Sequence, residues 1–317
     1  MKVIITGGAG YIGSILTREM LKNNFKVTVF DNFFFNQSNI FNDILHDKNF
    51  NLINEDVRKT NILKKELKKN DVVIPLAGIV GAPLCAKKPV LTKQINLDQI
   101  KNIVSNVSKN QIILLPVTNS GYGIGRKDKV YYETSELKPI SLYGKTKVSA
   151  ERAIQQHPNH ISFRLATVFG VSNRMRVDLL VNDFTYVAFK KRKLILFEEH
   201  FKRNYIHVRD VCSAFLYSLK NYKKFKNETF NVGLENANLS KLELALKIKR
   251  YVKNLKILKD KKRKDPDKRN YIVSNKKILS TGWKPTHSLD DGIVELLKFY
   301  QNFKVTNEAN NTFILKK

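Results

Sequence analysis

Apolar and polar positions alternate in a way that predicts strands and helices in turn along the first half of the chain. An apolar run at residues 2–6 is followed by apolar side chains at helical spacing over residues 11–23, and residues 26–30 alternate as a second strand does. The continuous apolar runs at 71–76 and 111–117 are typical of strands buried on both faces of a parallel sheet. The pattern predicts an α/β fold built on a doubly wound, Rossmann-type parallel sheet.

Two of these apolar runs contain a proline, Pro75 in one and Pro116 in the other. Proline has no backbone N–H to donate, so it interrupts the hydrogen bonding of a central strand. We therefore expect both prolines at the carboxyl ends of their strands, where pairing stops and ligand-binding loops begin.

The remaining pattern predicts further elements in both halves of the chain. Long helices are expected at 89–107 and 141–156, with strands at 51–53 and 161–168. Less regular patterns predict helices at 175–189, 208–220 and 239–252 and short strands at 194–197 and 229–232.

The loosening of the pattern after about residue 169 predicts two interleaved units. The first is a nucleotide-binding domain of residues 1–170, to which 204–232 return. The second is a smaller substrate-binding lobe of residues 171–203 and 233–317, whose final stretch from residue 301 is expected to be peripheral.

A glycine-rich turn follows the first predicted strand and opens the first predicted helix. Gly7, Gly10 and Gly13 are spaced for a tight turn, a close approach of the backbone to a pyrophosphate, and close packing of helix on strand. Asp31 ends the second strand, where an acidic residue accepts hydrogen bonds from an adenosine ribose and repels a 2′-phosphate. The context favours NAD over NADP and makes a mere turn role for Asp31 the weaker interpretation.

Tyr143 and Lys147 are four residues apart in a predicted helix, so their side chains share one face. A tyrosine with its ordinary pKa of about 10 is a poor base at neutral pH. An ammonium group about 4 Å away contributes about 4 kcal/mol at an intermediate dielectric, enough to lower the tyrosine pKa by about 3. The spacing therefore predicts that Lys147 lowers the pKa of Tyr143 and makes it a general base.

Composition narrows the class of protein less than these motifs do. The chain has 317 residues, 42% of them hydrophobic, and contains no apolar run long enough to span a bilayer. The net charge of +29 invites a nucleic-acid hypothesis, but the lysines are scattered and a solvated surface is the better interpretation. Two cysteines, Cys85 and Cys212, do not suggest a disulfide framework, so we expect a cytoplasmic protein and a structural role for the Cys85 thiol.

The glycine turn, the Tyr143/Lys147 pair and the segment 118–123 together resemble the extended short-chain dehydrogenase/reductase family. Within it the chain is similar to the NAD-dependent sugar-nucleotide epimerases and dehydratases, of which UDP-galactose 4-epimerase is a familiar member. The likeness runs from residue 1 to the Gly-Trp-Lys-Pro element at 282–285. Residues 119–125 and 174–184 also resemble nucleotide-activated heptose 4-dehydrogenases.

The resemblance assigns three catalytic residues and a set of cofactor contacts. Tyr143 is the expected base for the sugar O4 hydroxyl, Lys147 holds the nicotinamide ribose, and Thr118 hydrogen-bonds the same hydroxyl. Besides these, the residues expected to contact NAD are Gly7, Gly10, Tyr11, Ile12, Gly13, Asp31, Asn32, Asp56, Val57, Leu76, Ala77, Gly78 and Asn96. A plain helix-surface role for Asn96 stays open.

For the nucleotide-sugar, the resemblance implies that Arg203 clamps the diphosphate, and Arg263 is a second candidate that is equally well explained as a surface residue. Thr167 stands where many relatives have a phosphate-contacting asparagine, so the nucleotide stays open. Asn119 and Ser120 replace the acidic pair of the dehydratases, which argues against 4,6-dehydration. Both are expected next to the substrate, and no residue pattern suggests a metal site.

We therefore expect an NAD-dependent enzyme that oxidises C4 of a nucleotide-activated sugar, most simply as a 4-epimerase. A 4-dehydrogenase that releases a keto-sugar, for example from GDP-heptose, would use the same residues. A non-catalytic RNA-binding or scaffold protein on the same fold is an alternative of another class. The resemblance also implies a homodimer formed through the helices at 89–107 and 141–156, without membrane or nucleic-acid partners.

Overall fold

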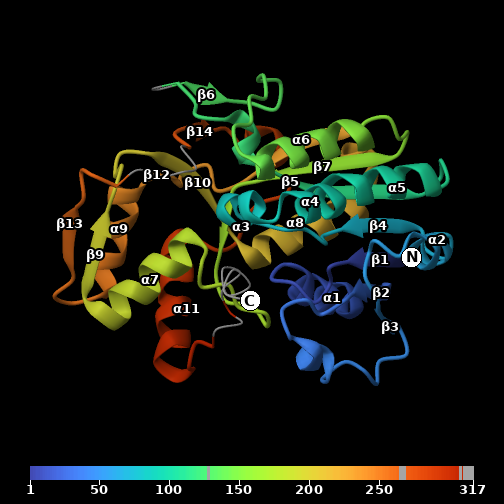
Figure 1. Cartoon of the computed structure of the whole chain (residues 1–317), viewed down its shortest axis with the longest axis horizontal. Helices are drawn as coiled ribbons and strands as arrows, with labels where there is room; N and C mark the ends of the chain where they lie inside the picture. Colours follow the sequence, from blue (N-terminus) through green and yellow to red (C-terminus); the bar gives the residue numbers. More distant parts are fainter. Residues whose placement is uncertain (127–128, 264–268, 307–308, 310–317) are drawn as a thin grey trace.

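The computed structural model describes residues 1–126, 129–263, 269–306 and 309. Its centre is a parallel sheet of seven strands in the order β11-β7-β5-β4-β1-β2-β3 (Figure 1). These strands are β1 (Lys2–Thr6), β2 (Lys26–Asp31), β3 (Phe50–Asn54), β4 (Val72–Pro75), β5 (Ile112–Thr118), β7 (His160–Leu165) and β11 (Glu228–Val232). The strand order reverses direction between β1 and β4, and doubly wound sheets bind ligands at such a point. The predicted α/β class with a parallel sheet is confirmed.

Helices cover both faces of this sheet because its strands are apolar on both. Val3 and Ile5 of β1 join a core with α1 (Gly13–Lys22) and α8 (Val208–Lys220). Ile4, between them, points to the other face, where it packs in a core with α2 (Thr60–Leu67), α5 (Gln99–Asn106) and α6 (Leu142–Ile154). All three β1 side chains are fully buried, which is why the strand is a continuous apolar run.

The long helix predicted at 89–107 forms with an irregularity in its middle. It begins as α4 (Pro89–Lys93), widens into a π-helical turn at Gln94–Asp98 and continues as α5. A shorter helix, α3 (Ala82–Lys87), precedes it. Single π-helical turns occur often at functional sites, and this one contains Asn96.

A smaller lobe lies beside the carboxyl ends of the central strands (Figure 1). Its strands form one sheet of β12 (Asn238–Ser240), β10 (Lys202–His207) and β8 (Thr167–Phe169), and the pairs β13 (Lys256–Lys259) with β9 (Lys193–Leu196) and β14 (Ile272–Val273) with β6 (Val130–Tyr131). Its helices are α7 (Leu180–Lys191), α9 (Lys241–Tyr251), α10 (Lys276–Ser280) and α11 (Leu289–Asn302). The short 3-10 helices are Ser38–Phe41, Asn119–Tyr122 and Tyr222–Lys224.

Several predicted boundaries differ from the structure for identifiable reasons. Pro75 ends β4 as expected, but Pro116 lies inside β5, which pairs with β4 only as far as Ile113 and so has a free side for the missing N–H. The single strand predicted at 161–168 is two strands in two different sheets, separated at Ala166. The helix predicted at 175–189 begins only at Leu180, because the preceding residues form an irregular segment of bends and a turn.

The last helix is packed into the core, whereas most of the described residues from 301 onward are exposed, as the sequence predicted. α11 buries Ile293, Leu296 and Tyr300 in the same core cluster that contains α1 and α8. Beyond it, the carbonyl of Ala309 accepts a hydrogen bond from the Val177 N–H at 2.8 Å. None of the helices in the described ranges is long and apolar enough to cross a membrane.

Candidate active site

A cavity of about 680 Å³ opens at the carboxyl ends of β1, β4 and β5 and extends into the smaller lobe. Its wall on the sheet side includes Gly7, Gly10, Tyr11, Leu76, Gly78, Asn96, Thr118, Tyr143 and Lys147. Its wall on the lobe side includes Thr167, Arg174, Arg176, Asp178, Asp183, Arg203, Lys241 and Arg269. The size is that of a small-molecule or cofactor site, and the lobe wall has an excess of positive charge.

The glycine turn has the geometry that its spacing predicted. Gly7 has φ +73°, and a Cβ there would lie 2.4 Å from the backbone N of Ala77. A Cβ on Gly13 would lie 2.6 Å from the Gly7 carbonyl oxygen, so helix and turn approach too closely for a side chain. Gly10 lines the cavity, and a Cβ there would meet only the Gly7 carbonyl oxygen, at 3.1 Å. The turn therefore presents bare backbone and the start of α1 to the cavity, which suits an anionic group.

Asp31 ends β2 beside this turn and is buried. Its carboxylate accepts hydrogen bonds from the N–H groups of Ala9 at 3.0 Å and Phe33 at 2.8 Å. Burial raises the pKa of the carboxyl group, and these two hydrogen bonds oppose the rise. The side chain thus joins the glycine turn to the loop that follows β2.

The other residues expected near the adenosine lie at the ends of β2 and β3. The Asn32 amide donates to the Asp56 carboxylate at 3.0 Å, and Asp56 also pairs with Arg58 at 2.9 Å. Val57 is buried beneath them. Ala77 and Gly78 follow Leu76 in the loop after β4, and both Leu76 and Gly78 line the cavity.

Tyr143 and Lys147 project from the first turns of α6 into the cavity, and Thr118 ends β5 beside them. The helix begins where it does because the Ser141 hydroxyl accepts a hydrogen bond from the Gly144 N–H at 3.1 Å. The Thr118 hydroxyl lies 3.0 Å from the Ser120 hydroxyl. The structure thus brings the three predicted catalytic residues to one wall of one cavity.

The electrostatics of this wall differ from the sequence prediction. Burial raises the pKa of Tyr143 to about 12, and the charges of Arg269 and Arg176 together with the Thr118 hydrogen bond oppose the rise. Burial also lowers the pKa of Lys147 to about 8. The Tyr143 pKa is therefore raised, and not lowered as predicted, because burial of the phenol is the largest influence on it and Lys147 is not among the groups that oppose the rise.

Asn96 has a definite structural partner. Its side-chain oxygen accepts from the Ile79 N–H and its amide donates to the Ile79 carbonyl, both at 2.8 Å. The side chain is buried and fixes the loop after β4 against the π-helical turn. The helix-surface interpretation of Asn96 is wrong.

Two expected substrate contacts do not reach the cavity. Asn119 and Ser120 are buried in the short helix after β5, and neither is among the residues that line the cavity wall. The Ser120 N–H and hydroxyl both hydrogen-bond the Thr118 hydroxyl. Ser120 therefore orients Thr118, and its expected direct contact with substrate is not supported.

The arginines of the lobe wall are only partly those that the sequence predicted. Arg203 of β10 is buried and lines the cavity, as expected of a clamp, and Thr167 of β8 lines it too. Arg263 instead projects from an exposed turn, where it pairs with Asp260 at 3.4 Å. The arginine that reaches the cavity from this part of the chain is Arg269, so the proposed role of Arg263 is wrong.

Arg176 and Asp178 were not anticipated as site residues. They form an ion pair of 2.5 Å that lines the cavity, and Arg176 is close enough to Tyr143 to influence its pKa. The sequence did not indicate that they face a cavity, because its apolar pattern predicted a helix over both residues. Cys85 lies near the same wall, where its thiol donates to the Ile79 carbonyl at 3.2 Å, and burial raises its pKa to about 11, which suits a structural thiol.

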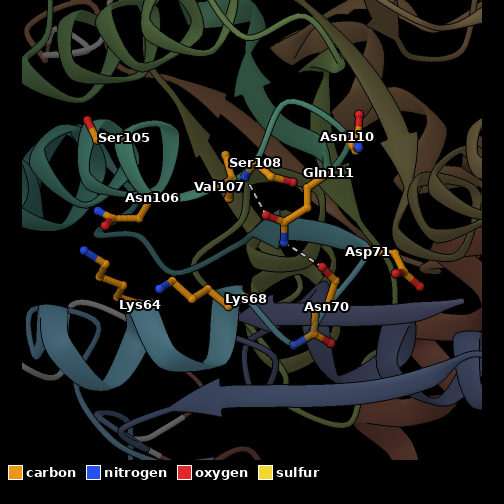
Figure 2. Close-up of a pocket in the computed structure, with 10 residues that line it drawn as sticks. All are labelled: Lys64, Lys68, Asn70, Asp71, Ser105, Asn106, Val107, Ser108, Asn110 and Gln111. Atoms are coloured by element: carbon orange, nitrogen blue, oxygen red, sulfur yellow. Dashed lines mark hydrogen bonds between the residues drawn. The ribbon is translucent and has the colours of Figure 1, made fainter.

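A second pocket of about 630 Å³ lies at the amino ends of the central strands, where β4 and β5 begin (Figure 2). Gln111 dominates it, donating to the carbonyls of Leu67 and Asn70 at 2.7 and 2.6 Å and accepting from the Ser108 N–H at 2.7 Å. The charged residues that line it are Lys64 of α2, Lys68 directly after α2, and Asp71. These bonds join strand ends, and we assign this pocket no chemistry. Across the described part of the chain, no cluster of three or more His, Cys, Asp or Glu side chains is placed to hold a metal ion.

Comparison with known proteins identifies the family to which this site belongs. The model of the NAD dependent epimerase/dehydratase family matches residues 3–233, most of the chain. UDP-glucose 4-epimerase of Lactobacillus helveticus is 26% identical over 334 residues, covering 95% of this chain and 98% of that protein. UDP-glucuronic acid decarboxylase 1 of Danio rerio is 26% identical over 329 residues, covering 99% of this chain and 76% of that protein.

Solved structures confirm the fold. The UDP-glucuronic acid 4-epimerase of Bacillus cereus, in complex with UDP-glucuronic acid and NAD, superimposes with a TM-score of 0.83. The match covers 95% of this chain and 99% of that one at 24% identity. The relatives by sequence include an epimerase and a decarboxylase. Similarity at this level therefore establishes the family, and the reaction must be inferred from the residues of the site.

Proposed function

The chain belongs to the NAD dependent epimerase/dehydratase family of enzymes, and from that premise we propose that it oxidises C4 of a nucleotide-activated sugar as a 4-epimerase. The observation that carries the proposal is the shared cavity. Thr118, Tyr143 and Lys147 line the cavity that the bare glycine turn also lines. Alcohol oxidation by NAD requires a group that takes the hydroxyl proton and a dinucleotide-binding site in the same cavity.

The residues of the sheet wall fit NAD. Bare backbone at Gly7, Gly10 and the start of α1 suits a pyrophosphate, and Asp31 at the end of β2 suits the adenosine ribose. In this proposal Lys147, which lines the same cavity, donates to the nicotinamide ribose. NAD, when bound, supplies a two-electron acceptor that in its oxidised form carries a positive ring.

In the proposed reaction the chain handles the proton of the sugar hydroxyl. The Tyr143 phenolate oxygen takes the O4 proton, while the Thr118 hydroxyl donates a hydrogen bond to the same oxygen. A phenol with a pKa of about 12 must lose its proton before it acts as a base. The charges of Arg269 and Arg176 favour that ionisation.

The lobe wall suits the rest of the substrate. Arg203 and Arg269 line the cavity away from the glycine turn, where a diphosphate would find two forked donors. The two positions after Thr118 are Asn119 and Ser120, where the dehydratases carry an acidic pair, and this difference favours 4-epimerisation over 4,6-dehydration. A 4-dehydrogenase that releases its keto-sugar uses the same groups and differs in whether the intermediate leaves.

Turnover of defined substrates tests the proposal. Purified protein with added NAD is incubated with UDP-, GDP-, CDP- and dTDP-sugars, and the products are followed by NMR. We expect a 4-epimer to accumulate with at least one of them. Absence of both turnover and NAD binding across the panel would contradict the proposal, and a free 4-keto product would replace epimerase with dehydrogenase.

A single substitution tests the role of the phenol. Tyr143→Phe should lower turnover by about 100-fold or more, the usual contribution of a general base, while NAD binding persists. Tyr132→Phe is the matched control, because Tyr132 is half exposed and outside the cavity wall. Undiminished turnover in Tyr143→Phe would remove this residue from the mechanism.

A further inference from the structure

Two segments far apart in sequence meet over the glycine turn. Phe35 comes from the loop after β2, and Arg174 comes from the irregular segment before α7. The Arg174 guanidinium carbon lies 4.1 Å from the centroid of the Phe35 ring, a close cation–π contact. Both side chains line the main cavity, and both also line a separate pocket of about 300 Å³. The pair is therefore a partition between the cofactor end of the cavity and the surface.

The Phe35 side of this partition is fixed to the glycine turn. The Phe35 N–H donates to the Gln37 side-chain oxygen at 2.9 Å, and the Gln37 amide reaches the Ala9 carbonyl at 3.5 Å. Asp31 accepts from the N–H groups of Ala9 and Phe33, at the other end of the same loop. The loop is thus held across the turn by contacts at both ends.

The Arg174 side is fixed to the first turn of α1. The Ser172 hydroxyl donates to the Tyr11 carbonyl at 2.6 Å and lies 3.1 Å from the Ser14 hydroxyl. Farther along, the Val177 N–H donates to the Ala309 carbonyl at 2.8 Å. These bonds hold Arg174 beside the backbone that would receive a pyrophosphate.

The electrostatics of Arg174 favour an anion beneath it. Arg174 is only 6% exposed, and burial together with the neighbouring charge of Arg176 lowers its pKa to about 10. Asp31 and Asp178 are the anionic side chains that oppose this effect. A bound pyrophosphate would add a further compensating charge next to two buried guanidinium groups.

We propose that Phe35 and Arg174 form a latch that retains NAD and NADH through the catalytic cycle. This inference rests on the proposed function and bears on its outcome. In the first half-reaction, the C4 alcohol loses a hydride to NAD⁺ and its hydroxyl proton to Tyr143, leaving a ketone and NADH. If NADH cannot leave, the hydride returns to a carbonyl in the same cavity, and return to the opposite face of the keto-sugar gives the 4-epimer.

Cofactor exchange tests the latch without any sugar substrate. Protein saturated with NAD is mixed with an excess of isotopically labelled NAD, desalted rapidly at intervals, and analysed for bound label by mass spectrometry. We expect slow exchange in the parent protein and at least tenfold faster exchange in Phe35→Ala and Arg174→Ala. The double variant should exchange little faster than either single variant, because each substitution already opens the same contact.

Matched controls separate the latch from general damage. Phe34→Ala removes the neighbouring ring, which is 43% exposed and outside the cavity wall, and Arg250→Ala removes an exposed arginine of α9. Phe35→Leu is not a control but a third latch variant, which keeps an apolar side chain without a ring face and should also exchange faster than the parent. Thermal melting of the NAD-saturated variants establishes that each is folded.

Exchange at the parent rate in Phe35→Ala, Phe35→Leu and Arg174→Ala would overturn the latch, as would equal acceleration in the controls or rapid exchange in the parent protein. A parent protein that binds no NAD at all would instead contradict the proposed function. The two failures are therefore distinguishable.

Discussion

Asn96→Ala is the substitution whose effect the structure defines most fully. It removes the two 2.8 Å hydrogen bonds between the Asn96 side chain and the Ile79 backbone. Each such bond contributes about 1 kcal/mol net, and each buried backbone group left without a partner costs about 1–3 kcal/mol. Because Asn96 is only 2% exposed, water cannot readily replace the lost partners. We expect a loss of about 3–5 kcal/mol in the free energy of unfolding.

The same substitution should weaken cofactor binding, because the loop after β4 lines the cavity through Leu76, Gly78 and Ile79. Urea denaturation measures the stability, and titration with NAD measures the affinity. Asn106→Ala is the control, since the Asn106 amide bonds only within its own helix, to Asn102. A loss below about 1 kcal/mol in Asn96→Ala, or an equal loss in the control, would refute the reasoning that these two bonds anchor the loop.

Two further predictions concern Lys147, which lines the cavity, and the buried Arg164–Glu151 ion pair. Burial lowers the pKa of Lys147 to about 8, below its ordinary value of 10.5. The charged lysine therefore destabilises the fold below pH 8, and this penalty disappears as pH rises to 10.5. Lys147→Met should therefore be more stable than the parent at pH 7. The gain should be at most about 3 kcal/mol, because the lysine side chain keeps some solvent contact. The difference in stability, measured by denaturation, should vanish near pH 10.5. Arg164 pairs with Glu151 at 3.0 Å in a buried site. Arg164→Met should cost about 3–5 kcal/mol by leaving the buried carboxylate without its cation, and adding Glu151→Leu should restore much of that loss in thermal denaturation. A single variant as stable as the parent would show that this carboxylate is not held in a dry interior.

The parts of the site that the sequence predicts depend on short-range geometry. Gly7, Gly10 and Gly13 belong to one turn, and the backbone angle and close contacts they require follow from their own spacing. Tyr143 and Lys147 lie one turn apart in one helix, so their shared direction follows from helical periodicity. Predictions of this kind need no knowledge of how distant segments pack.

The parts that the sequence did not predict depend on contacts between distant segments. Nothing local distinguishes Arg269, which lines the cavity, from Arg263, which is exposed to solvent six residues earlier in a lysine-rich stretch. The raised Tyr143 pKa depends on burial, which no spacing reports. The start of α11, by contrast, is predictable from local sequence, because Ser288 and Asp291 form a capping box there.

The continuity of the hydrophobic core has a consequence for how enzymes of this design diversify. Leu16 of α1, Leu244 of α9 and Leu296 of α11 belong to a single buried cluster, although the last two lie in the smaller lobe. The chain also passes repeatedly between the lobe and the central sheet, as β8 and β10 lead back to α8 and β11. Such a lobe cannot be exchanged as a module by recombination. New substrate preferences must accumulate one side chain at a time, within walls that the whole molecule holds in place.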